Sequence, residues 1–202
     1  MGLIWCPITG CPEQAVKETE RVSTRSDGVS DAVISAVRHV ARTTGPGALM
    51  VDDLCPKDLS RLAWSGNPEH LRSVARALER VALGDVEYLV VRAPYGEPVA
   101  KGGIDYTQND TAGTLWQLAT HARLQSLGLG ACLVAEAEQR IRRRGLPWAM
   151  LSVEDDNPRA RALYERLGYA AWRRQTEAWH YEDDGGALRL YETEVTVLRK
   201  RL

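Results

Sequence analysis

The stretch QSLGLGA, from Gln125 to Ala131, decides the fold of this chain. It follows a short apolar run at 115–120 and precedes a segment, 130–145, in which apolar residues recur at helical spacing. This order predicts a strand, a tight glycine turn and a helix. Such a turn directs free backbone N–H groups at one point outside the helix N-terminus, where the helix dipole also favours an anion. The stretch therefore predicts a phosphate site, although a plain strand-to-helix loop would carry the same glycines.

The glycine spacing narrows the kind of phosphate site. A P-loop requires a Lys directly after its last glycine, and no Lys follows Gly130. The dinucleotide fingerprint GxGxxG requires a third glycine, and Leu133 stands at that position. The pattern that remains is QxxGxG. A nucleotide enzyme of the phosphoryl-transfer type is also disfavoured, because the Lys and Asp that it needs are absent from this region.

A second motif, NPRARALYERLGY, runs from Asn157 to Tyr169. Asn157 is a typical N-cap, Pro158 suits the first helical position, and Gly168 suits the C-terminal cap. The apolar residues of the motif recur at i, i+3, i+4 and i+7, on one face of a helix: Ala160, Leu163, Tyr164 and Leu167. The motif predicts a short helix with both ends capped and one face buried.

QxxGxG followed by NxxAxxLYExLGY resembles the GCN5-related N-acetyltransferase (GNAT) family. Members of this family transfer an acetyl group from acetyl-CoA to an amine. The resemblance extends from Ala48 to Leu202, and the segment 93–113 carries little of it. It implies an α/β fold with a mixed, mostly antiparallel sheet, splayed at the cofactor site and covered by helices on both faces. It further implies an acyltransferase in which a primary amine attacks acetyl-CoA directly in a ternary complex, without a metal.

The pattern along the chain agrees with an α/β fold, because helical and strand patterns alternate before a terminal hairpin. Expected strands cover 49–54, 86–92, 99–106, 115–120, 147–153, 169–181 and 188–199. Expected helices begin at 56 and 157 and cover 68–83 and 130–145. Residues 183–186 read DDGG and predict the turn of the hairpin.

Two regions are expected. Residues 1–46 form an N-terminal extension with one amphipathic helix, in which Ser30 is the N-cap and valines recur at helical spacing. Residues 47–202 form the N-acetyltransferase domain. The helix of the extension lies on a loose arm in this interpretation. It could instead pack on the domain, pack in a dimer, or act as a lid over the substrate groove.

The resemblance also implies where acetyl-CoA binds. Backbone amides of the glycine turn are expected to hold the diphosphate, and main-chain groups of the preceding strand to hold the acetyl and pantetheine arm. The start of the second motif would line the far side of the arm. The expected residues are Gln125, Ser126, Leu127, Gly128, Leu129, Gly130 and Ala131 in the turn, Leu118, Ala119 and Thr120 in the strand, and Asn157 and Ala160 in the second motif. A backbone N–H near Ala119 or Thr120 would polarise the thioester carbonyl.

Acetyl transfer needs a neutral amine, a polarised carbonyl and a proton for the leaving thiolate. The resemblance gives Tyr164 the role of acid, and the alternative is an ordinary core aromatic. The base is less well defined, because Thr114 stands near the position where the family often has Glu. Glu154, at a strand end, is the expected base. Asp105 and His121 are weaker alternatives, and a chain of water molecules is another.

Charge and cysteine content exclude other classes of protein. The formal net charge of −1 gives no case for a nucleic-acid binder, and the arginines at 140–144 end a helix, where cations are favoured. The cysteines at 6, 11, 55 and 132 form no CxxC pair, so no metal site is expected; Cys6 and Cys11 could pair.

We expect a cytoplasmic enzyme without a membrane segment, because no apolar run reaches the ~18 residues that span a bilayer. Its partner would be a small-molecule amine or a protein amine, and acidic residues near the cleft would steer a cation inward. A homodimer is possible. The alternative function is a catalytically silent module of the same fold that binds acyl-CoA as a sensor or interaction partner.

Overall fold

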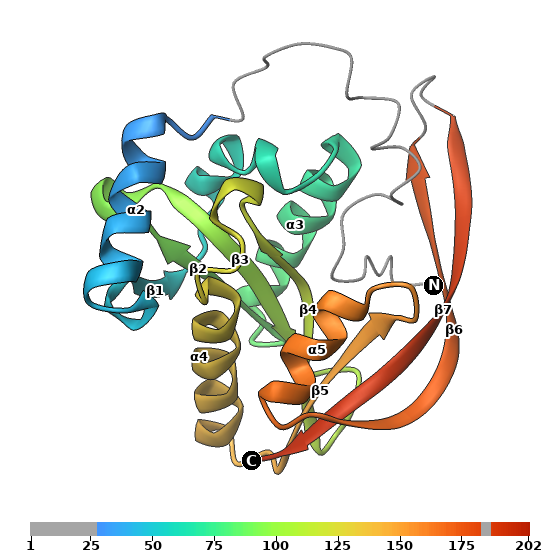
Figure 1. The fold of residues 1–202 in the computed structure, drawn as a ribbon. Coiled ribbons are helices and arrows are strands. Elements are labelled where there is room, and N and C mark those ends of the chain that lie inside the picture. Colours follow the sequence, from blue (N-terminus) through green and yellow to red (C-terminus); the bar gives the residue numbers. More distant parts are fainter. Residues whose placement is uncertain (1–27, 183–186) are drawn as a thin grey trace.

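The computed structural model of the protein describes residues 28–182 and 187–202. Seven strands form one sheet in the order β1-β2-β3-β4-β5-β7-β6 (Figure 1). The β4–β5 pair is parallel and the other neighbouring pairs are antiparallel, so the predicted mixed, mostly antiparallel sheet is confirmed. The strands are β1 (Met50–Asp53), β2 (Val86–Arg92), β3 (Pro98–Asp105), β4 (Ala112–Thr120), β5 (Trp148–Glu154), β6 (Ala170–Glu182) and β7 (Leu188–Arg201).

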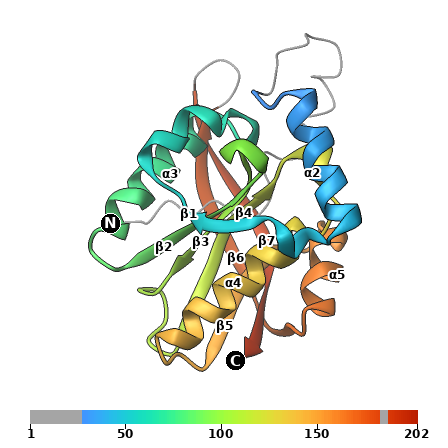
Figure 2. The same ribbon diagram turned by 90° about the vertical axis from the view of Figure 1, so that its left-hand side faces the viewer.

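Helices cover both faces of this sheet, as predicted (Figures 1 and 2). The α-helices are α2 (Asp31–Thr43), α3 (Pro68–Val81), α4 (Leu129–Arg143) and α5 (Pro158–Arg166). Short 3-10 helices lie between them: η2 (Pro46–Ala48), η3 (Pro56–Arg61), η4 (Ala63–Ser65), η5 (Pro94–Gly96) and η6 (Ala122–Leu124). Helix α3 packs on one face of β2–β4, and α2, α4 and α5 contribute to the core on the other face.

Strand β4 begins earlier than the sequence pattern indicates. The predicted strand starts at residue 115, whereas β4 starts at Ala112 and includes Gly113. A Cβ on Gly113 would lie 2.5 Å from Cγ1 of Ile141, so this glycine allows α4 to approach the strand closely. The glycine looks like a strand breaker in the sequence, but here it serves packing. The predicted turn at 183–186 and the possible Cys6–Cys11 pair lie outside the described residues.

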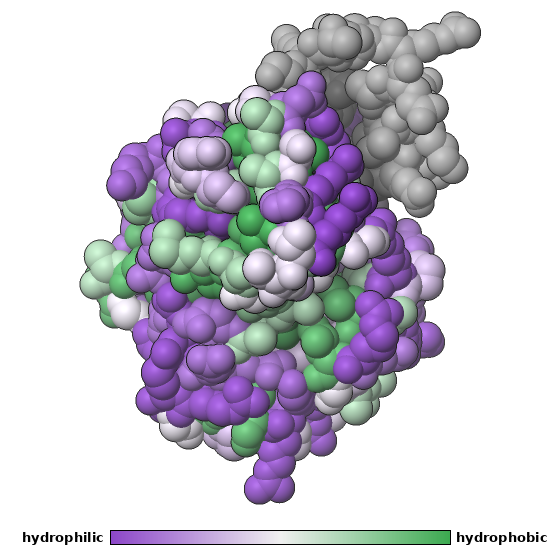
Figure 3. Space-filling model, turned by 60° about the vertical axis from the view of Figure 1, so that its left-hand side comes forward, coloured by the Kyte–Doolittle hydropathy of each residue, from purple (hydrophilic) through white to green (hydrophobic). Residues whose placement is uncertain are grey.

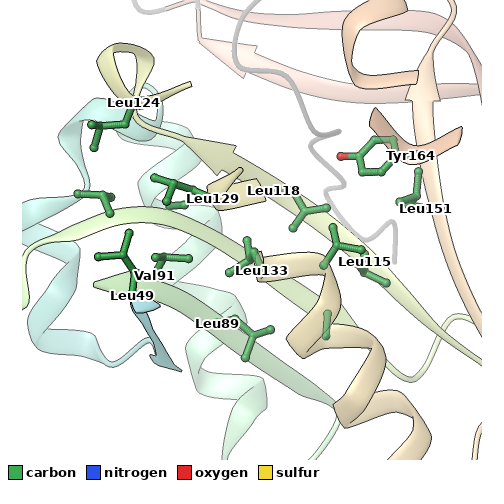
Figure 4. Close-up of a cluster of buried hydrophobic side chains, with 14 of the residues drawn as sticks. Leu49, Leu89, Val91, Leu115, Leu118, Leu124, Leu129, Leu133, Leu151 and Tyr164 are labelled. Carbon is green, nitrogen blue, oxygen red and sulfur yellow. The ribbon is translucent and has the colours of Figure 1, made fainter. Parts of the chain in front are cut away.

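The main hydrophobic core lies between the sheet and helices α2, α4 and α5. The buried face of α4 carries Leu129, Leu133, Ala137 and Ile141, as its periodicity predicts. Several of these side chains face leucines of β2 and β4 in Figure 4. Helix α2 begins at the predicted N-cap Ser30 and buries Val33, Ile34 and Val37 in the same core. Helix α2 is therefore packed on the domain. The division of the chain into an N-terminal extension (1–46) and an N-acetyltransferase domain (47–202) stays a prediction.

The surface is largely hydrophilic, and the view in Figure 3 shows apolar areas surrounded by polar ones. The basic run at the end of α4 is engaged with carboxylates. Its N···O contacts are Arg140 with Glu136 (3.1 Å) and Glu87 (3.0 Å), Arg142 with Glu138 (3.5 Å), Arg143 with Glu136 (2.9 Å) and Arg144 with Glu87 (3.0 Å). These ion pairs give the basic run a structural role in the fold. Among the described helices, none has both the length and the apolar character to span a membrane.

The sheet splays between its two parallel strands. The β4–β5 register covers the pairs from Ala112↔Trp148 to Thr114↔Met150, and β4 and β5 then continue to Thr120 and Glu154 without pairing with each other (Figure 1). Beyond Thr114, the edge of β4 that faces β5 therefore has no strand beside it among the described residues. This separation of β4 from β5 beyond Thr114 and Met150, called the splay below, is the feature that the resemblance implies. The free backbone groups of this edge are available to an extended ligand.

Candidate functional site

The glycine turn connects the splayed end of β4 to helix α4. Its backbone bends through two residues with positive φ, Ser126 at 64° and Gly128 at 86°, and Gly128 is the N-cap of α4. A Cβ on Gly128 would lie 2.8 Å from Cγ of Pro46 in η2, so the close approach of η2 also requires glycine here. The N-terminus of α4 carries no side-chain cap. Its first N–H groups are therefore available to an anion.

Gly130 faces the gap between β4 and α5. A Cβ at this position would lie 3.8 Å from Oγ1 of Thr120 and 3.7 Å from Cδ2 of Leu163. Both are ordinary van der Waals distances, and no unusual φ requires glycine at this position. A side chain at this position would therefore stand between the end of β4 and α5, where glycine has none.

Arg159 of α5 reaches across to the glycine turn. Its Nη1 donates to Oε1 of Gln125 and its Nη2 donates to Oγ of Ser126, each at 2.8 Å. The guanidinium thus joins the two motifs that the sequence singles out. An arginine in the first turn opposes the helix dipole and does not stabilise α5 by itself. Its position next to the predicted phosphate turn instead makes its positive charge available to an anion there.

The start of α5 is built as predicted. Oδ1 of Asn157 accepts a hydrogen bond from the N–H of Ala160 at 3.0 Å, and Pro158 occupies the first turn. Both Asn157 and Ala160 are half-buried. Gly168 follows the helix with a φ of 89°, which is the left-handed conformation expected of a C-terminal cap. Of these two caps, Asn157 fixes the end of α5 that faces the glycine turn.

Tyr164 projects from α5 toward the splay. The residue is 2% exposed, and its ring packs edge-to-face against Tyr169, with ring centroids 6.0 Å apart. Figure 4 shows its hydroxyl oxygen directed from α5 toward Leu118 of β4. Burial raises the pKa of the Tyr164 phenol. The phenol therefore keeps its proton at neutral pH and faces the side of β4 that has no strand partner.

Strand β4 contains a β-bulge at the level of the splay. Its register with β3 shifts between the pairs Lys101↔Ala119 and Gly103↔Trp116, and Gln117 adopts a φ of 50°. The N–H of His121 donates to the carbonyl of Val99. Because bonded residues alternate along an antiparallel pair, the N–H of Ala119 points toward β3 and that of Thr120 points toward the splay.

A buried polar network lies under this bulge, on the α3 face of the sheet. Nζ of Lys101 contacts Nε2 of His70 at 2.9 Å and donates to Oη of Tyr88 and to the carbonyl oxygen of Gln117, each at 3.1 Å. The Tyr88 hydroxyl donates to Oε1 of Gln117 at 2.8 Å, and Nε2 of Gln117 donates to Oγ of Ser73 at 3.0 Å. Both the backbone and the side chain of Gln117 are thus held.

The side chains of Ser152, Glu154 and Glu177 share one face of the β5–β7–β6 part of the sheet, because the pairing register places alternate residues together. Oγ of Ser152 donates to Oε1 of Glu177 at 2.8 Å, and Nε2 of Gln175 donates to the same oxygen at 2.7 Å. The other oxygen, Oε2, is buried and has no hydrogen-bond partner among the residues that the structure describes. Burial raises the pKa of Glu177, and the negative charge of Glu154 raises it further.

The two weaker base candidates have structural contacts of their own. Asp105 accepts from Arg80 at 2.9 Å and from the hydroxyl of Thr107 at 2.7 Å, and these contacts lower its pKa although burial alone would raise it. Nδ1 of His121 accepts from the N–H of Arg123 and caps η6. We therefore assign neither residue a catalytic role.

Three features of this region were not predicted from the sequence. Arg159 lies inside the second motif, and its unfavourable place in the first helical turn is the signal that could have revealed it. Lys101 interrupts an apolar strand, which is unusual for a residue that is almost never buried alone. Glu177 lies in a strand with many polar residues, and no pattern distinguishes it there. Among the described residues, no group of three or more metal-binding side chains comes together.

Comparison with known proteins links this geometry to one family. The family described as "Acetyltransferase (GNAT) family" has a model that matches residues 57–169. A mycothiol acetyltransferase from Nocardiopsis dassonvillei is 36% identical over 70 residues, which is 35% of this chain and 21% of that protein. The corresponding protein from Thermobifida fusca is 33% identical over 70 residues, 35% of this chain and 22% of that protein. The chain spans about a fifth of the length of these curated relatives.

Solved structures share the fold. The PaiA N-acetyltransferase from Thermoplasma acidophilum, in complex with coenzyme A, superimposes with a TM-score of 0.56 at 15% identity, over 76% of this chain and 99% of that one. A chimera of the spermidine N-acetyltransferase SpeG from Vibrio cholerae and hSSAT gives a TM-score of 0.60 at 16% identity, over 76% of this chain and 96% of that one. At these identities the likeness concerns the fold.

Proposed function

The chain belongs to the acetyltransferase (GNAT) family and has the fold of an acyl-CoA N-acyltransferase, and from this premise we propose that it transfers an acetyl group from acetyl-CoA to a primary amine. One observation carries the proposal. A glycine turn with an uncapped helix N-terminus follows the strand that borders the splay, and Gly130 places no side chain between Thr120 and Leu163. A long ligand with a diphosphate at one place and an extended arm at another matches this arrangement.

In this proposal, CoA binds along the residues expected from the sequence. The diphosphate lies at the amides of the turn from Gln125 to Ala131, and the pantetheine arm passes Gly130 into the splay. Leu118, Ala119 and Thr120 offer main-chain groups on one side of the arm, and Asn157 and Ala160 line the other. The side chain of Leu129 is buried in the core, so this residue contributes its backbone. Acetyl-CoA would be a co-substrate that needs no metal.

The reaction follows from these positions. The neutral amine attacks the thioester carbon, a carbon–nitrogen bond forms, and the carbon–sulfur bond breaks. Tyr164, whose hydroxyl faces the splay, gives a proton to the leaving sulfur. A proton lost by the new amide nitrogen restores the phenol. A carboxylate on the face of β5–β7–β6 that carries Ser152 takes the first proton of the incoming ammonium and passes it to solvent.

Glu154 is the base expected from the sequence, and the structure adds Glu177 beside it. Glu177 has the stronger case, because its Oε2 lacks a donor that an ammonium would supply. Ser152, which donates to its other oxygen, stands on β5 just beyond the last residue that pairs with β4. The hydrogen bond between them thus connects the carboxylate with the place where the splay opens. In this assignment Glu154 acts through its charge, which raises the pKa of Glu177.

The two carboxylates are distinguished by the pH dependence of kcat/KM. A base must be ionised, so activity falls as pH decreases through its pKa. We expect Glu177→Gln to reduce kcat/KM about fivefold at pH 7 and to remove the acidic limb of the profile. Glu154→Gln should keep the limb and move it to lower pH, because the charge that raises the pKa of Glu177 is gone.

Glu194→Gln is the matched control for both variants. Glu194 lies on the other face of the same hairpin, where it accepts from Thr176 at 2.6 Å, and its replacement should leave the profile unchanged. If Glu154→Gln removes the acidic limb while Glu177→Gln retains it, the base is Glu154, as the sequence indicates, and the assignment to Glu177 is wrong.

Arg159 is expected to strengthen the binding of CoA through its positive charge. We predict that Arg159→Ala raises the Kd of CoA about fivefold at low ionic strength and that the difference shrinks as salt is added. Calorimetric titrations at two salt concentrations measure both effects. Arg161→Ala is the control, because Arg161 lies in the same helix and pairs with Glu165 at 3.0 Å. An unchanged Kd for Arg159→Ala would remove this residue from the site.

The silent-module alternative is not favoured by the family comparison, and a direct assay tests it. Purified protein is incubated with acetyl-CoA and, in turn, spermidine, glucosamine, lysine and a peptide with a free N-terminus, and free thiol is measured. We expect thiol release with at least one amine. Tight binding of CoA without release for any amine would favour the silent module. The amine itself, a cytoplasmic location and a possible homodimer stay predictions.

A further inference from the structure

The structure contains a buried lysine that the reaction described above does not use. Lys101 is fully buried on β3, and the hydrogen-bond acceptors around its Nζ include His70, Tyr88 and the backbone carbonyl of Gln117. Burial, together with the positive charge of Lys101, lowers the pKa of His70 to about 3. The imidazole is therefore neutral at pH 7, and its Nε2 can accept from Nζ. Each of these three groups can accept one N–H bond of a lysine ammonium.

One of these acceptors belongs to the peptide that forms the bulge. The carbonyl of Gln117 and the N–H of Leu118 are parts of the same planar peptide unit, and in a trans peptide they point in opposite directions. The carbonyl points to Nζ, on the side of β3 and α3. The N–H of Leu118 consequently points away from Nζ, and the alternation that directs the N–H of Thr120 toward the splay directs that of Leu118, two residues before it, to the same edge. In the view of Figure 4, the hydroxyl of Tyr164 is directed from α5 toward the side chain of Leu118.

The Gln117–Leu118 peptide needs contacts with other residues to keep this orientation. Gln117 has a φ of 50°, and a residue other than glycine in the left-handed region costs of order 1–3 kcal/mol. Lys101 fixes its carbonyl, and Tyr88 and Ser73 fix its side chain. A hydrogen bond from a charged donor to a peptide carbonyl also polarises the N–H at the other end of that peptide. Orientation and polarisation therefore act on the same donor.

We propose that Lys101 is a positioning residue for the acetyl transfer, which aims and polarises the Leu118 N–H at the thioester carbonyl oxygen through the Gln117 carbonyl. This inference rests on the proposed function. It places the carbonyl donor at Leu118, one bulge residue before the Ala119–Thr120 segment expected from the sequence. Lys101 does not touch the substrate. It acts through the Gln117–Leu118 peptide, and a developing negative charge on the oxygen is stabilised by the N–H that it orients.

The test measures the polarisation of the carbonyl directly. Acetyl-CoA labelled with ¹³C at the thioester carbonyl is bound to the wild type and to Lys101→Met, and the carbonyl stretch is recorded by difference infrared spectroscopy. We expect the stretch to lie at a lower frequency in the wild type than in free acetyl-CoA, and to move back toward the free value in the variant. We also expect kcat to fall about fivefold, with the KM of acetyl-CoA within about twofold, since the ligand keeps its diphosphate contacts.

A second pair of variants covers the case in which Lys101→Met does not fold. Tyr88→Phe removes one acceptor of Nζ and one hydrogen bond to Gln117 while its ring stays in place, and it should shift the stretch in the same direction by a smaller amount. Tyr106→Phe is the matched control, because the Tyr106 hydroxyl donates to Glu87 at 3.0 Å, away from the network. Its spectrum should equal that of the wild type.

The infrared measurement needs only bound acetyl-CoA, so its result is independent of any amine. A carbonyl stretch that is identical in the wild type, in Lys101→Met and in Tyr88→Phe overturns the role of Lys101. Failure of the proposed function has a different signature, which is the absence of thiol release from the wild type with every amine in the panel.

Discussion

Replacing Gly130 by valine is expected to weaken the binding of CoA at least about a hundredfold, which corresponds to ~2.7 kcal/mol of binding free energy. The side chain would project between Thr120 and Leu163, into the path that we propose for the pantetheine arm. Gly130→Ala should give a smaller loss, because its methyl group meets its neighbours at ordinary contact distances. The increase of the effect with side-chain size is the signature of a blocked passage.

The fold should tolerate these changes at Gly130. The backbone there needs no positive φ, and glycine is the weaker helix former, so the Tm should change by only a few degrees. Gly128 is less suitable for this test, because a Cβ there meets both a φ of 86° and Pro46 at 2.8 Å. Ala135→Val, on the exposed side of the same helix, is the control, and its Kd for CoA should equal that of the wild type. Unchanged affinity in Gly130→Val would place the cofactor elsewhere.

The second large effect is expected for Tyr164→Phe, which should lower kcat at least about tenfold and leave the affinity for acetyl-CoA nearly unchanged. The phenylalanine ring keeps the packing against Tyr169, so the lower kcat would result from the missing proton donor alone. Because burial raises the pKa of the phenol, the wild-type residue is protonated throughout the neutral range and no limb of the pH profile near neutrality belongs to it.

Tyr169→Phe is the matched control for this prediction. Tyr169 is also buried, forms the other half of the ring pair, and lies next to Lys200, whose Nζ is 5.8 Å from its ring centroid. Deleting its hydroxyl should leave kcat unchanged. If steady-state kinetics give the same kcat for Tyr164→Phe and the wild type, another group or water protonates the sulfur.

The parts of the site that follow local rules were predictable from the sequence. The caps Asn157 and Gly168 and the periodicity of α4 depend on neighbouring residues, and the structure has them where they were expected. The splay is a different case, since it depends on where two distant strands stop pairing. Its presence was implied by the family resemblance, and no residue pattern in β4 or β5 indicates that their pairing ends at Thr114.

The contacts that complete the site join segments far apart in the chain, and this explains why they were missed. Arg159 reaches Gln125, and Lys101 reaches His70 and Gln117, only once the sheet is assembled. The positive φ of Gln117 is likewise a result of the register shift between β3 and β4. A sequence pattern can mark an arginine in a first helical turn or a lysine in an apolar strand as unusual. It does not identify the partner.

The central claim is that the amides around Gly128 and Gly130 hold the diphosphate of CoA, and amide chemical shifts test it most directly. ¹⁵N-labelled protein is titrated with CoA and, separately, with pantetheine, which has the arm but lacks the diphosphate. The account predicts that the amides from Gln125 to Gly130 shift with CoA and stay in place with pantetheine, while those of Leu118 and Thr120 respond to both. Binding of CoA that leaves the amides from Gln125 to Gly130 unshifted would contradict it.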